Sequence, residues 1–391
     1  MAKIDDSVKK KVPELRFKGF TDEWEERKFA DFIDVKSGKD YKHLNSGSIP
    51  VYGTGGYMLS VDRALSDIDA IGIGRKGTID KPYLLKAPFW TVDTLFYAVP
   101  KQNIDLQFSL SIFKKINWKK FDESTGVPSL SKTVINSVSV SVPSYEEQQK
   151  IGSFFKQLDD TIALHQRKLD LLKEQKKGFL QKMFPKNGAK VPELRFAGFA
   201  DDWEDLKLSS IAERVTRKNK NNESTLPLTI SAQDGLVDQN DYFNKQVASR
   251  DVTGYFLVKN GEFAYNKSYS NGYPWGAIKR LDKYEMGVLS TLYIVFKPTA
   301  INSQFLVSYY ETTRWYREVS KNAAEGARNH GLLNISPNDF FNTLLTIPKS
   351  AEEQQQIGSF FKQLDDTIAL HQHKLDLLKE QKKGFLQKMF V

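Results

Sequence analysis

Apolar side chains recur with a seven-residue period over two long stretches of the chain, 146–184 and 352–390. This pattern predicts α-helices with one apolar stripe, as in coiled coils. At 1.5 Å per residue, each helix would be about 58 Å long. We expect the two stripes to pack on each other through Ile151, Phe155, Leu158, Ile162, His165, Leu169, Leu172, Ile357, Phe361, Leu364, Ile368, His371, Leu375 and Leu378.

Capping signals bound both stretches. Ser144 and Glu147 before the first helix, and Ser350 and Glu353 before the second, have the S-x-x-E spacing of a capping box. In such a box the hydroxyl and the carboxylate satisfy free backbone N–H groups at the start of the helix. Pro185 and the following Asn-Gly end the first helix.

The two stretches are near copies of each other. They differ only at Lys150, which corresponds to Gln356, and at Arg167, which corresponds to His373. A second repeat, KVPELRFKGFTDEWE from Lys11 and KVPELRFAGFADDWE from Lys190, precedes each unlike region. We call the second repeat the A segment and the helix stretch B. With the unlike regions X (26–145) and Y (205–351), the order is A-X-B-A-Y-B, a duplicated domain-plus-helix unit.

Connectivity and charge predict that the two helices run antiparallel. Only a short linker, 185–189, separates the first helix from the second A segment, so the second helix must run back along the first. Residues 146–160 hold four acids and two bases, whereas 167–190 hold eight bases and two acids. Antiparallel pairing places acidic helix starts beside basic helix ends, and each end also complements its own helix dipole.

Composition narrows the class of protein without fixing it. The chain has 391 residues, 40% apolar content, a net charge of +9 and no cysteine. This excludes disulfides, cysteine-ligated zinc and a thiol nucleophile, and it is compatible with an acidic polymer as partner. The absence of a signal peptide and of a long apolar run predicts a cytoplasmic protein that does not enter the membrane.

The unlike regions read as short strands and loops. Strands are predicted within 51–62, 70–80, 89–100 and 137–143 of X, and within 228–238, 262–272, 287–298 and 342–348 of Y. Two matches suggest a shared skeleton: Asp93–Phe96 with Ser290–Tyr293, and Arg75–Gly77 with Asn266–Ser268.

The A-X-B-A-Y-B order, the PELRF…W starts (Pro13–Trp24, Pro192–Trp203) and the helix starts VPSYEEQQKI and IPKSAEEQQQI closely resemble the specificity subunits of type I restriction–modification systems. The resemblance covers essentially the whole chain. It implies an α+β fold in which two mixed α/β target-recognition domains are joined by two antiparallel helices with an approximate two-fold. The expected domains are 1–145, the first A segment with its recognition domain; 146–185, the first helix; 186–351, the second A segment with its domain; and 352–391, the second helix.

The resemblance also implies partners and function. Each recognition domain would read one half of an asymmetric bipartite site in double-stranded DNA, with the helices as the ruler between the halves. Two modification (methyltransferase) subunits would dock along the helices, with two restriction subunits as optional further partners. This chain would hold no cofactor itself; S-adenosylmethionine, and ATP with Mg²⁺ where a restriction subunit is present, belong on the partner subunits.

Loops that combine aromatic, amide and basic side chains are the candidates for DNA contact. Arginine can form two hydrogen bonds with guanine, and asparagine with adenine, in the major groove. Many polar loop residues contact only phosphate or water. The candidates are Lys39, Tyr41, Lys42, Tyr52, Thr54, Arg75, Lys76 and Ser129 in X, and Lys267, Ser268, Tyr269, Tyr273, Trp275, Arg328, Asn329 and His330 in Y. The basic run 214–224 is either a DNA-facing arm or a mobile surface loop.

One motif allows two interpretations. GIGRKG, with glycines at 72, 74 and 77, matches the dinucleotide fingerprint, but no helix signal follows, so we reject that reading. Glycines around Arg75 and Lys76 fit a strand-end loop that approaches a phosphate backbone. An ordinary hairpin with solvated bases is the alternative.

No catalytic site is expected. His371 and His373 lie two apart, so on a helix they point to different faces, and a buried histidine pair of His165 with His371 is favoured over a metal site. A phosphate-loop motif and an Asn-Pro-Pro-aromatic methylation motif are both missing from the sequence. The prediction is a non-catalytic subunit. A stand-alone DNA-binding regulator and a protein–protein spacer are the alternatives from other classes.

Overall fold

The computed structural model describes residues 12–186, 188–268, 272–323 and 333–391. The chain forms two compact units. Unit 1 comprises residues up to Lys168 together with His371–Val391, and unit 2 comprises Leu169–Leu370. Each long helix therefore contributes one part to each unit.

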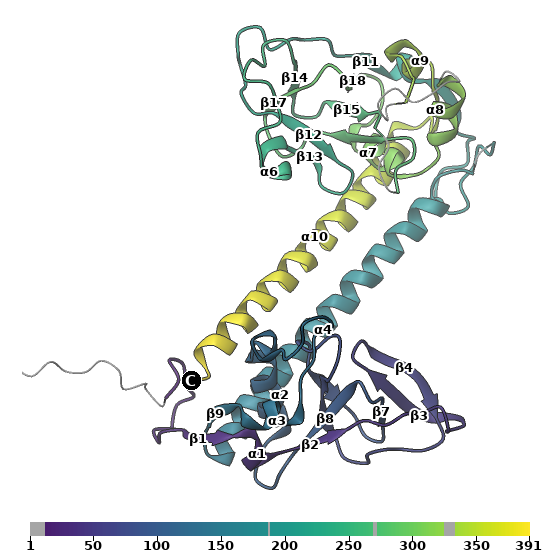
Figure 1. The fold of residues 1–391 in the computed structure, drawn as a ribbon. Helices are drawn as coiled ribbons and strands as arrows, with labels where there is room; N and C mark the ends of the chain where they lie inside the picture. The colour runs from purple at the N-terminus through teal and green to yellow at the C-terminus, as the bar shows by residue number, and fades with distance from the viewer. Residues whose placement is uncertain (1–11, 187, 269–271, 324–332) are drawn as a thin grey trace, which may run out of the picture. The chain divides into compact units, whose positions relative to one another are not determined.

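Unit 1 is built on a four-stranded antiparallel sheet in the order β2-β8-β5-β6. A three-stranded sheet, β4-β3-β7, and the pair β1–β9 complete its strands. Figure 1 labels most of these elements. Their bounds are β1 Glu25–Lys28, α1 Phe29–Phe32, β2 Ile33–Ser37, β3 Ser46–Gly53, β4 Gly56–Val61, β5 Ala70–Gly74, β6 Tyr83–Leu85, β7 Trp90–Thr91, β8 Leu95–Pro100, α2 Leu106–Lys115, a 3-10 turn Trp118–Phe121, α3 Lys132–Ser137 and β9 Ser139–Val142.

Unit 2 repeats this plan with different residues. Its main sheet has the order β11-β18-β15-β16, and β10–β19, β12–β13 and β14–β17 form separate antiparallel pairs. The bounds are β10 Glu204–Lys207, α5 Leu208–Ile211, β11 Ala212–Arg214, β12 Leu228–Ser231, β13 Gly235–Asp238, α6 Gln239–Phe243, β14 Phe256–Lys259, β15 Phe263–Asn266, β16 Ala277–Arg280, β17 Met286–Leu289, β18 Ile294–Pro298, α7 Ser303–Glu311, α8 Tyr316–Asn322, α9 Pro337–Phe341 and β19 Leu344–Ile347. The predicted α+β class is thus confirmed.

The two predicted long helices are also confirmed. They are α4, Tyr145–Lys182, and α10, Ala351–Lys388, of 38 residues each. Contacts within each unit show that they run antiparallel. In unit 1 the Phe154 and Phe385 ring centroids are 5.0 Å apart and His165 Nδ1 lies 3.3 Å from His371 Nδ1, and in unit 2 Phe179 contacts Phe360 at 5.0 Å.

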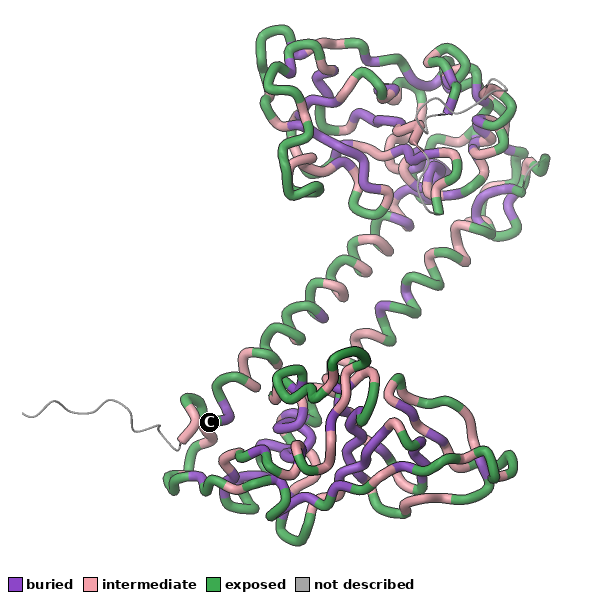
Figure 2. The backbone as a smooth tube through the Cα atoms, in the orientation of Figure 1, coloured by how far each residue is buried: buried purple, intermediate pink, exposed green. Residues whose placement is uncertain are grey.

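Every residue of the expected stripe is buried or half-buried. Figure 2 shows the buried and half-buried positions recurring along both helices between exposed ones. A mean period of 3.5 residues keeps such a stripe facing a partner helix over many turns. At the helix starts, Ile151, Phe155, Ile357 and Phe361 are also part of the apolar cores of their units.

The expected capping boxes are only half present. Ser144 Oγ accepts the Glu147 N–H at 3.4 Å, and Ser350 Oγ accepts the Glu353 N–H at 3.3 Å. Both carboxylates, however, are bound by arginines of the A segments. Arg16 donates from Nε and Nη2 to Glu147 at 2.8 Å each, in the bidentate geometry that makes such pairs strong. The S-x-x-E pattern therefore predicted the capping role of the serine hydroxyl correctly. It predicted the wrong partner for the glutamate carboxylate, which binds an arginine.

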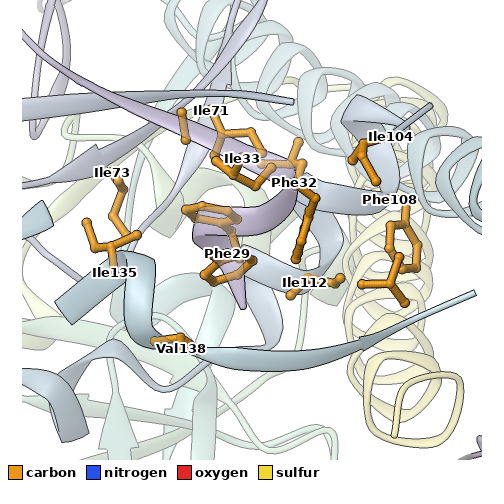
Figure 3. Packing of buried hydrophobic residues seen from close by; sticks show 14 of the residues in the cluster. Phe29, Phe32, Ile33, Ile71, Ile73, Ile104, Phe108, Ile112, Ile135 and Val138 are labelled. Carbon is orange, nitrogen blue, oxygen red and sulfur yellow. The ribbon is translucent and has the colours of Figure 1, made fainter. Parts of the chain in front are cut away.

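Each unit has its own apolar core where α1 or α5, the main sheet and a long helix meet. Figure 3 shows Phe29 and Phe32 of α1 among isoleucines of β2, β5 and α2 in unit 1. Trp24 of the first A segment and Trp203 of the second are almost fully buried in these cores. Each A segment therefore belongs to the same compact unit as the region X or Y that follows it in the sequence.

Candidate nucleic-acid interface

The loop after β5 carries two exposed cations in unit 1. The N–H of Arg75 donates to the Thr94 carbonyl at 2.8 Å, which fixes the loop against the start of β8. The Arg75 guanidinium lies over the Phe96 ring, 5.9 Å from its centroid, and donates to the Asp93 carbonyl at 3.4 Å. No carboxylate within the described residues pairs with Arg75 or Lys76. Their charge is therefore open to an anionic partner.

Three loops meet at this point. Lys76 pairs with Ser129 in an isolated β-bridge, and the Gly77 N–H donates to the Pro128 carbonyl at 2.8 Å. Gly77 has a φ of +95°, and a Cβ placed there would lie 3.8 Å from Thr54 Oγ1 of the β3–β4 turn. The predicted candidates Thr54, Arg75, Lys76 and Ser129 thus come together.

A hollow of about 480 Å³ opens beside them, lined by Arg75, Lys76 and Lys132 among others. Glu123 also lines it, but its carboxylate already accepts the Ser131 N–H at 3.0 Å. The hollow is therefore basic on balance. A strand-end loop with two free cations beside such a hollow can hold phosphate oxygens.

The aromatic candidates of X have a different place. Tyr41 and Tyr52 are half-buried and pack with Trp90, whose indole N–H donates to the Lys39 carbonyl at 2.9 Å. The side chains of Lys39 and Lys42 are exposed on the same segment. Tyr41 holds this segment to the domain, and the exposed side chains of the two lysines can reach a ligand.

In unit 2 the loop after β15 is in the equivalent position. The Leu333 N–H donates to the Lys267 carbonyl at 3.0 Å, as the Leu130 N–H donates to the Arg75 carbonyl at 2.9 Å. Lys267 Nζ donates to the Ile335 carbonyl at 3.3 Å, and burial lowers its pKa. Next to it, the Ser268 N–H donates to Asn266 Oδ1 at 3.0 Å.

This geometry corrects the expected alignment of X with Y by one residue. In the sheets, Ile73 pairs with Phe96 and Tyr265 with Ile294, and Pro100 and Pro298 end the equivalent strands β8 and β18. Arg75 is therefore equivalent to Lys267 and not to Asn266, and the Asp93–Phe96 match also shifts by one. The sequence match failed because hydrogen-bond register, and not local similarity, fixes which residues are equivalent.

The remaining candidates of Y are divided. Tyr273 and Trp275 are half-buried and pack on the cores of unit 2, and the Trp275 carbonyl accepts the Tyr265 hydroxyl at 2.8 Å. Tyr269, Arg328, Asn329 and His330 lie outside the described residues, so they remain predictions.

The centre of the basic run 214–224 is packed against its domain. Arg217 donates to both oxygens of Glu262 at 2.8 Å, and Lys218 lies 4.2 Å from the Phe256 ring centroid. Asn219 is fully buried and donates to the Ser224 carbonyl at 2.8 Å. Both cations at its centre, Arg217 and Lys218, therefore already have partners within the domain.

Unit 2 also has a larger basic cleft that the sequence did not reveal. It has a volume of about 980 Å³ and lies between the end of α4, the edge strand β16 and the end of α7. Lys173, Lys177 and Lys279 line it and form no ion pair with a carboxylate of the described residues, and burial lowers the pKa of Lys279. No sequence signal marks it, because its lysines come from distant segments.

The described residues contain neither a cluster of metal-ligating side chains nor a membrane-spanning helix. No group of three or more His, Asp or Glu side chains there could hold a metal ion, and no helix there is long and apolar enough to cross a bilayer.

The family model for the type I restriction modification DNA specificity domain matches residues 21–174 and 200–380. The chain belongs to this family. The two matches cover the X and Y regions separately, each with the start of its helix. The chain is therefore a DNA specificity subunit of a type I restriction–modification system, and it is not itself catalytic.

One curated relative and one solved structure are similar to this chain. The MjaVIII type I restriction enzyme specificity subunit of Methanocaldococcus jannaschii is 22% identical over 345 residues, which cover 82% of this chain and 75% of the relative. The crystal structure of a type I restriction–modification S subunit from M. genitalium has a TM-score of 0.67 at 14% identity and covers 97% of this chain and 99% of that one. The second likeness supports the fold.

Proposed function

We propose that the recognition domains of units 1 and 2 each read one half of an asymmetric bipartite DNA site, and that the α4–α10 pair sets the gap between the halves. The observation that carries this proposal is the repetition of one plan with different residues. Arg75 and Lys267 occupy the same position on equivalent sheets. The loops around them differ in sequence, so each domain offers a different surface to DNA.

In this proposal the free cations of unit 1 contact phosphates and place the domain in register. Lys39, Lys42, Arg75 and Lys76 are all exposed. The loops around these cations contact the bases. In unit 2 the bases are also contacted by the segment that contains Arg328, Asn329 and His330. Counterion release then makes binding fall steeply with salt.

The long helices provide a surface for partner subunits. In unit 1, Leu164 is 62% exposed and Leu377 is 46% exposed; in unit 2, Leu171 and Leu370 are 53% and 65% exposed. The antiparallel pairing puts the two leucines of each unit at nearly the same level along the pair. Such exposed apolar side chains on an otherwise polar face favour docking of another protein.

We propose that these leucines receive one modification subunit per unit. Those subunits bring S-adenosylmethionine and methylate adenine. Restriction subunits, with ATP and Mg²⁺, are further partners in a cytoplasmic complex on double-stranded DNA.

Co-expression with the methylating subunit, followed by sequencing of methylated adenines, tests whether each recognition domain reads one half of the site. We expect one asymmetric motif with a fixed gap. Replacing 26–145 by the recognition domain of another specificity subunit should change one half of the motif. A change in both halves would contradict independent reading, and tight binding to a bipartite site without any partner would favour a stand-alone regulator.

Arg75→Ala with Lys76→Ala should weaken DNA binding of the assembled complex by at least tenfold and reduce its salt dependence, since two phosphate contacts are lost. Lys156→Ala, at an exposed position of α4 where Lys156 pairs with Asp160, is the matched control. Equal binding of both variants would remove these two cations from the interface.

A further inference from the structure

One face of each long helix holds its recognition domain with the same four residues. On α4 these are Gln148, Gly152, Phe155 and Asp159, and on α10 they are Gln354, Gly358, Phe361 and Asp365. Spacings of four, three and four align them on one side of a helix. We call each set of four the docking stripe.

The first two residues of the stripe recognise main chain. Gln148 Oε1 accepts the Asp105 N–H at 3.0 Å, and Gln354 Oε1 accepts the Asn302 N–H at 2.9 Å. These are the residues that cap α2 and α7. A backbone N–H is offered by nearly any residue type, so this contact places little demand on the sequence of the domain.

The glycines let the capped helices come close. A Cβ at Gly152 would lie 2.8 Å from the Phe108 nitrogen, and a Cβ at Gly358 would lie 2.7 Å from the Phe305 nitrogen. Either distance is too short for any side chain, so the first turns of α2 and α7 rest directly on the long helices.

At the next position the domain and the stripe meet on a shared ring: Phe155 of the stripe contacts Phe390, and Phe361 contacts Phe184. Phe108 packs on Phe390 with ring centroids 5.7 Å apart, and Phe305 packs on Phe184 at 5.7 Å. Up to this point the two domains dock identically.

At the last position of the stripe, the two recognition domains contribute side chains of opposite charge. In unit 1, Lys114 of α2 donates to Asp159 at 2.7 Å, and Asp159 also pairs with Lys382 of α10. In unit 2 the equivalent residue is Glu311 of α7, which pairs at 2.6 Å with Lys176, and Lys176 also pairs with Asp365. The long helices thus present the same Asp–Lys pair to both domains. One domain approaches it with a cation and the other with an anion.

We propose that this interhelical Asp–Lys pair is a socket for either charge, so that the same helices accept recognition domains whose helix ends in a lysine or in a glutamate. Together with the main-chain contacts, it defines what a compatible domain needs: an Asp or Asn cap, a phenylalanine in the first turn and one charge of either sign near the helix end. The socket concerns how the domains are held and is independent of the DNA they read.

The electrostatics of the two sockets differ as this arrangement requires. Burial opposes the charge of Asp159, but the hydrogen bonds from Lys114 and Lys382 outweigh it and hold its pKa below the ordinary value. For Asp365, burial and then the nearby Glu311 raise the pKa. The cluster of Lys114, Asp159 and Lys382 has one cation in excess. In unit 2, Glu311 and Asp365 outnumber Lys176 by one anion, and the nearby Lys279 lowers the pKa of Asp365 in part.

A charge-inversion cycle tests the socket. Lys114→Glu should keep the melting temperature of the full chain within about 2 °C of the wild type, because the new carboxylate reaches Lys382. Asp159→Asn should lower it by about 3–6 °C, because Lys114 and Lys382 then face each other without an anion. Combining the two changes should recover more than half of that loss.

The cycle has a matched control and a local readout. Lys156→Glu reverses a charge in an exposed i,i+4 pair with Asp160 and should shift the melting temperature by less than about 1 °C. Amide hydrogen exchange of α2 should increase in Asp159→Asn and return toward wild type in the double variant, since it reports docking of that helix.

Unit 2 supplies an independent mirror test. Lys176→Met should destabilise the chain, because Glu311 and Asp365 lose their shared cation, and adding Glu311→Lys should recover it. The socket is contradicted if Lys114→Glu costs as much as Asp159→Asn, or if either double variant is no more stable than its Asp159→Asn or Lys176→Met parent. If Asp159→Asn does not fold, the Lys176→Met pair decides the question.

Discussion

The two units make the same joint between an A segment and a helix end, but only one of them makes it along a continuous chain. In unit 2, α4 runs through the linker into its A segment, and the Leu194 N–H donates to the Lys182 carbonyl at 2.9 Å. In unit 1 the equivalent bond, from the Leu15 N–H to the Lys388 carbonyl, is also 2.9 Å and joins segments far apart in the sequence.

The aromatic packing of the joint repeats as closely. Trp203 contacts Phe184 at 6.0 Å between ring centroids, and Trp24 contacts Phe390 at 6.1 Å, both nearly perpendicular. Side-chain packing therefore specifies the joint, and the covalent connection adds little to its geometry.

The linker does change what surrounds the joint. In unit 2 the linker residues border a groove of about 210 Å³ next to Phe184. The equivalent groove of unit 1, next to Phe390, is about 470 Å³, and Lys115 there donates to the Val391 carbonyl at 2.9 Å. The joint of unit 1 thus depends more on its few aromatic and polar contacts.

The largest effect is expected from removing the aromatic side chain at each joint. Phe390→Ala and Phe184→Ala should each leave a cavity that costs about 3–5 kcal/mol of unfolding free energy. Phe184→Ala should cost less, because the linker 185–189 also joins the end of α4 to its A segment. Urea unfolding measures the free energy, and hydrogen exchange over the last turn of α10 locates the loss. An equal or larger effect of Phe184→Ala would show that the linker does not support its joint.

The second-largest loss of stability is expected from removing the arginines of the A segments. Glu147 and Glu353 are each 1% exposed at the side chain, so Arg16→Ala or Arg195→Ala leaves a buried carboxylate unpaired at a cost of about 3 kcal/mol. Arg195→Ala should be milder, because the Trp203 indole still donates to Glu353 at 3.3 Å.

The Trp24 indole has no such partner within the described part of unit 1. Melting temperatures of the two variants give the ranking. Arg16→Lys and Arg195→Lys serve as controls that keep the charge but lose the bidentate geometry. A larger effect at Arg195 would reverse the comparison.

A smaller effect is expected from the histidine pair of the helix seam. Burial, then Lys374 and His371, lower the pKa of His165 below its ordinary 6.5. The unfolded chain therefore takes up protons first as the pH falls through 6.5, and stability declines. His165→Leu with His371→Leu should remove this decline between pH 7 and 5, whereas His373→Leu at an exposed position should not. Melting curves over that range check it, and an unchanged slope in the double variant would rule the pair out.

The smallest effect is expected from moving the chain ends. A permutant would begin at Lys190, run to Phe390, continue through the linker sequence PKNGA into Lys11 and end at Phe184. Because both joints are specified by packing, its unfolding free energy should lie within about 1 kcal/mol of the original. Chemical denaturation measures it, and a large loss would mean that connectivity, and not packing, holds unit 2 together.

The long helices and their pairing could be predicted from the sequence because they depend on local periodicity and connectivity. The heptad pattern gave α4 and α10 to within a few residues. Roles that depend on distant partners could not be predicted in this way. Glu147 and Glu353 looked like capping residues, but Arg16 and Arg195, more than a hundred positions earlier, bind them.

The candidate site was predictable only in part for the same reason. Glycines and cations marked the loop at Arg75, whereas its partner in unit 2 was placed one residue away because sheet register is not visible in the sequence. Gly152 and Gly358 gave no signal at all in the sequence, since their role depends on the helix that rests on them.

The most direct test of the account is to exchange the two recognition domains within one chain, with 205–351 placed after the first A segment and 26–145 after the second. The two joints and docking stripes are equivalent, so the exchanged chain, co-expressed with the methylating subunit, should methylate the same asymmetric motif with the same gap. A different motif, a different gap or loss of methylation by a folded complex would contradict the equivalence of the two units.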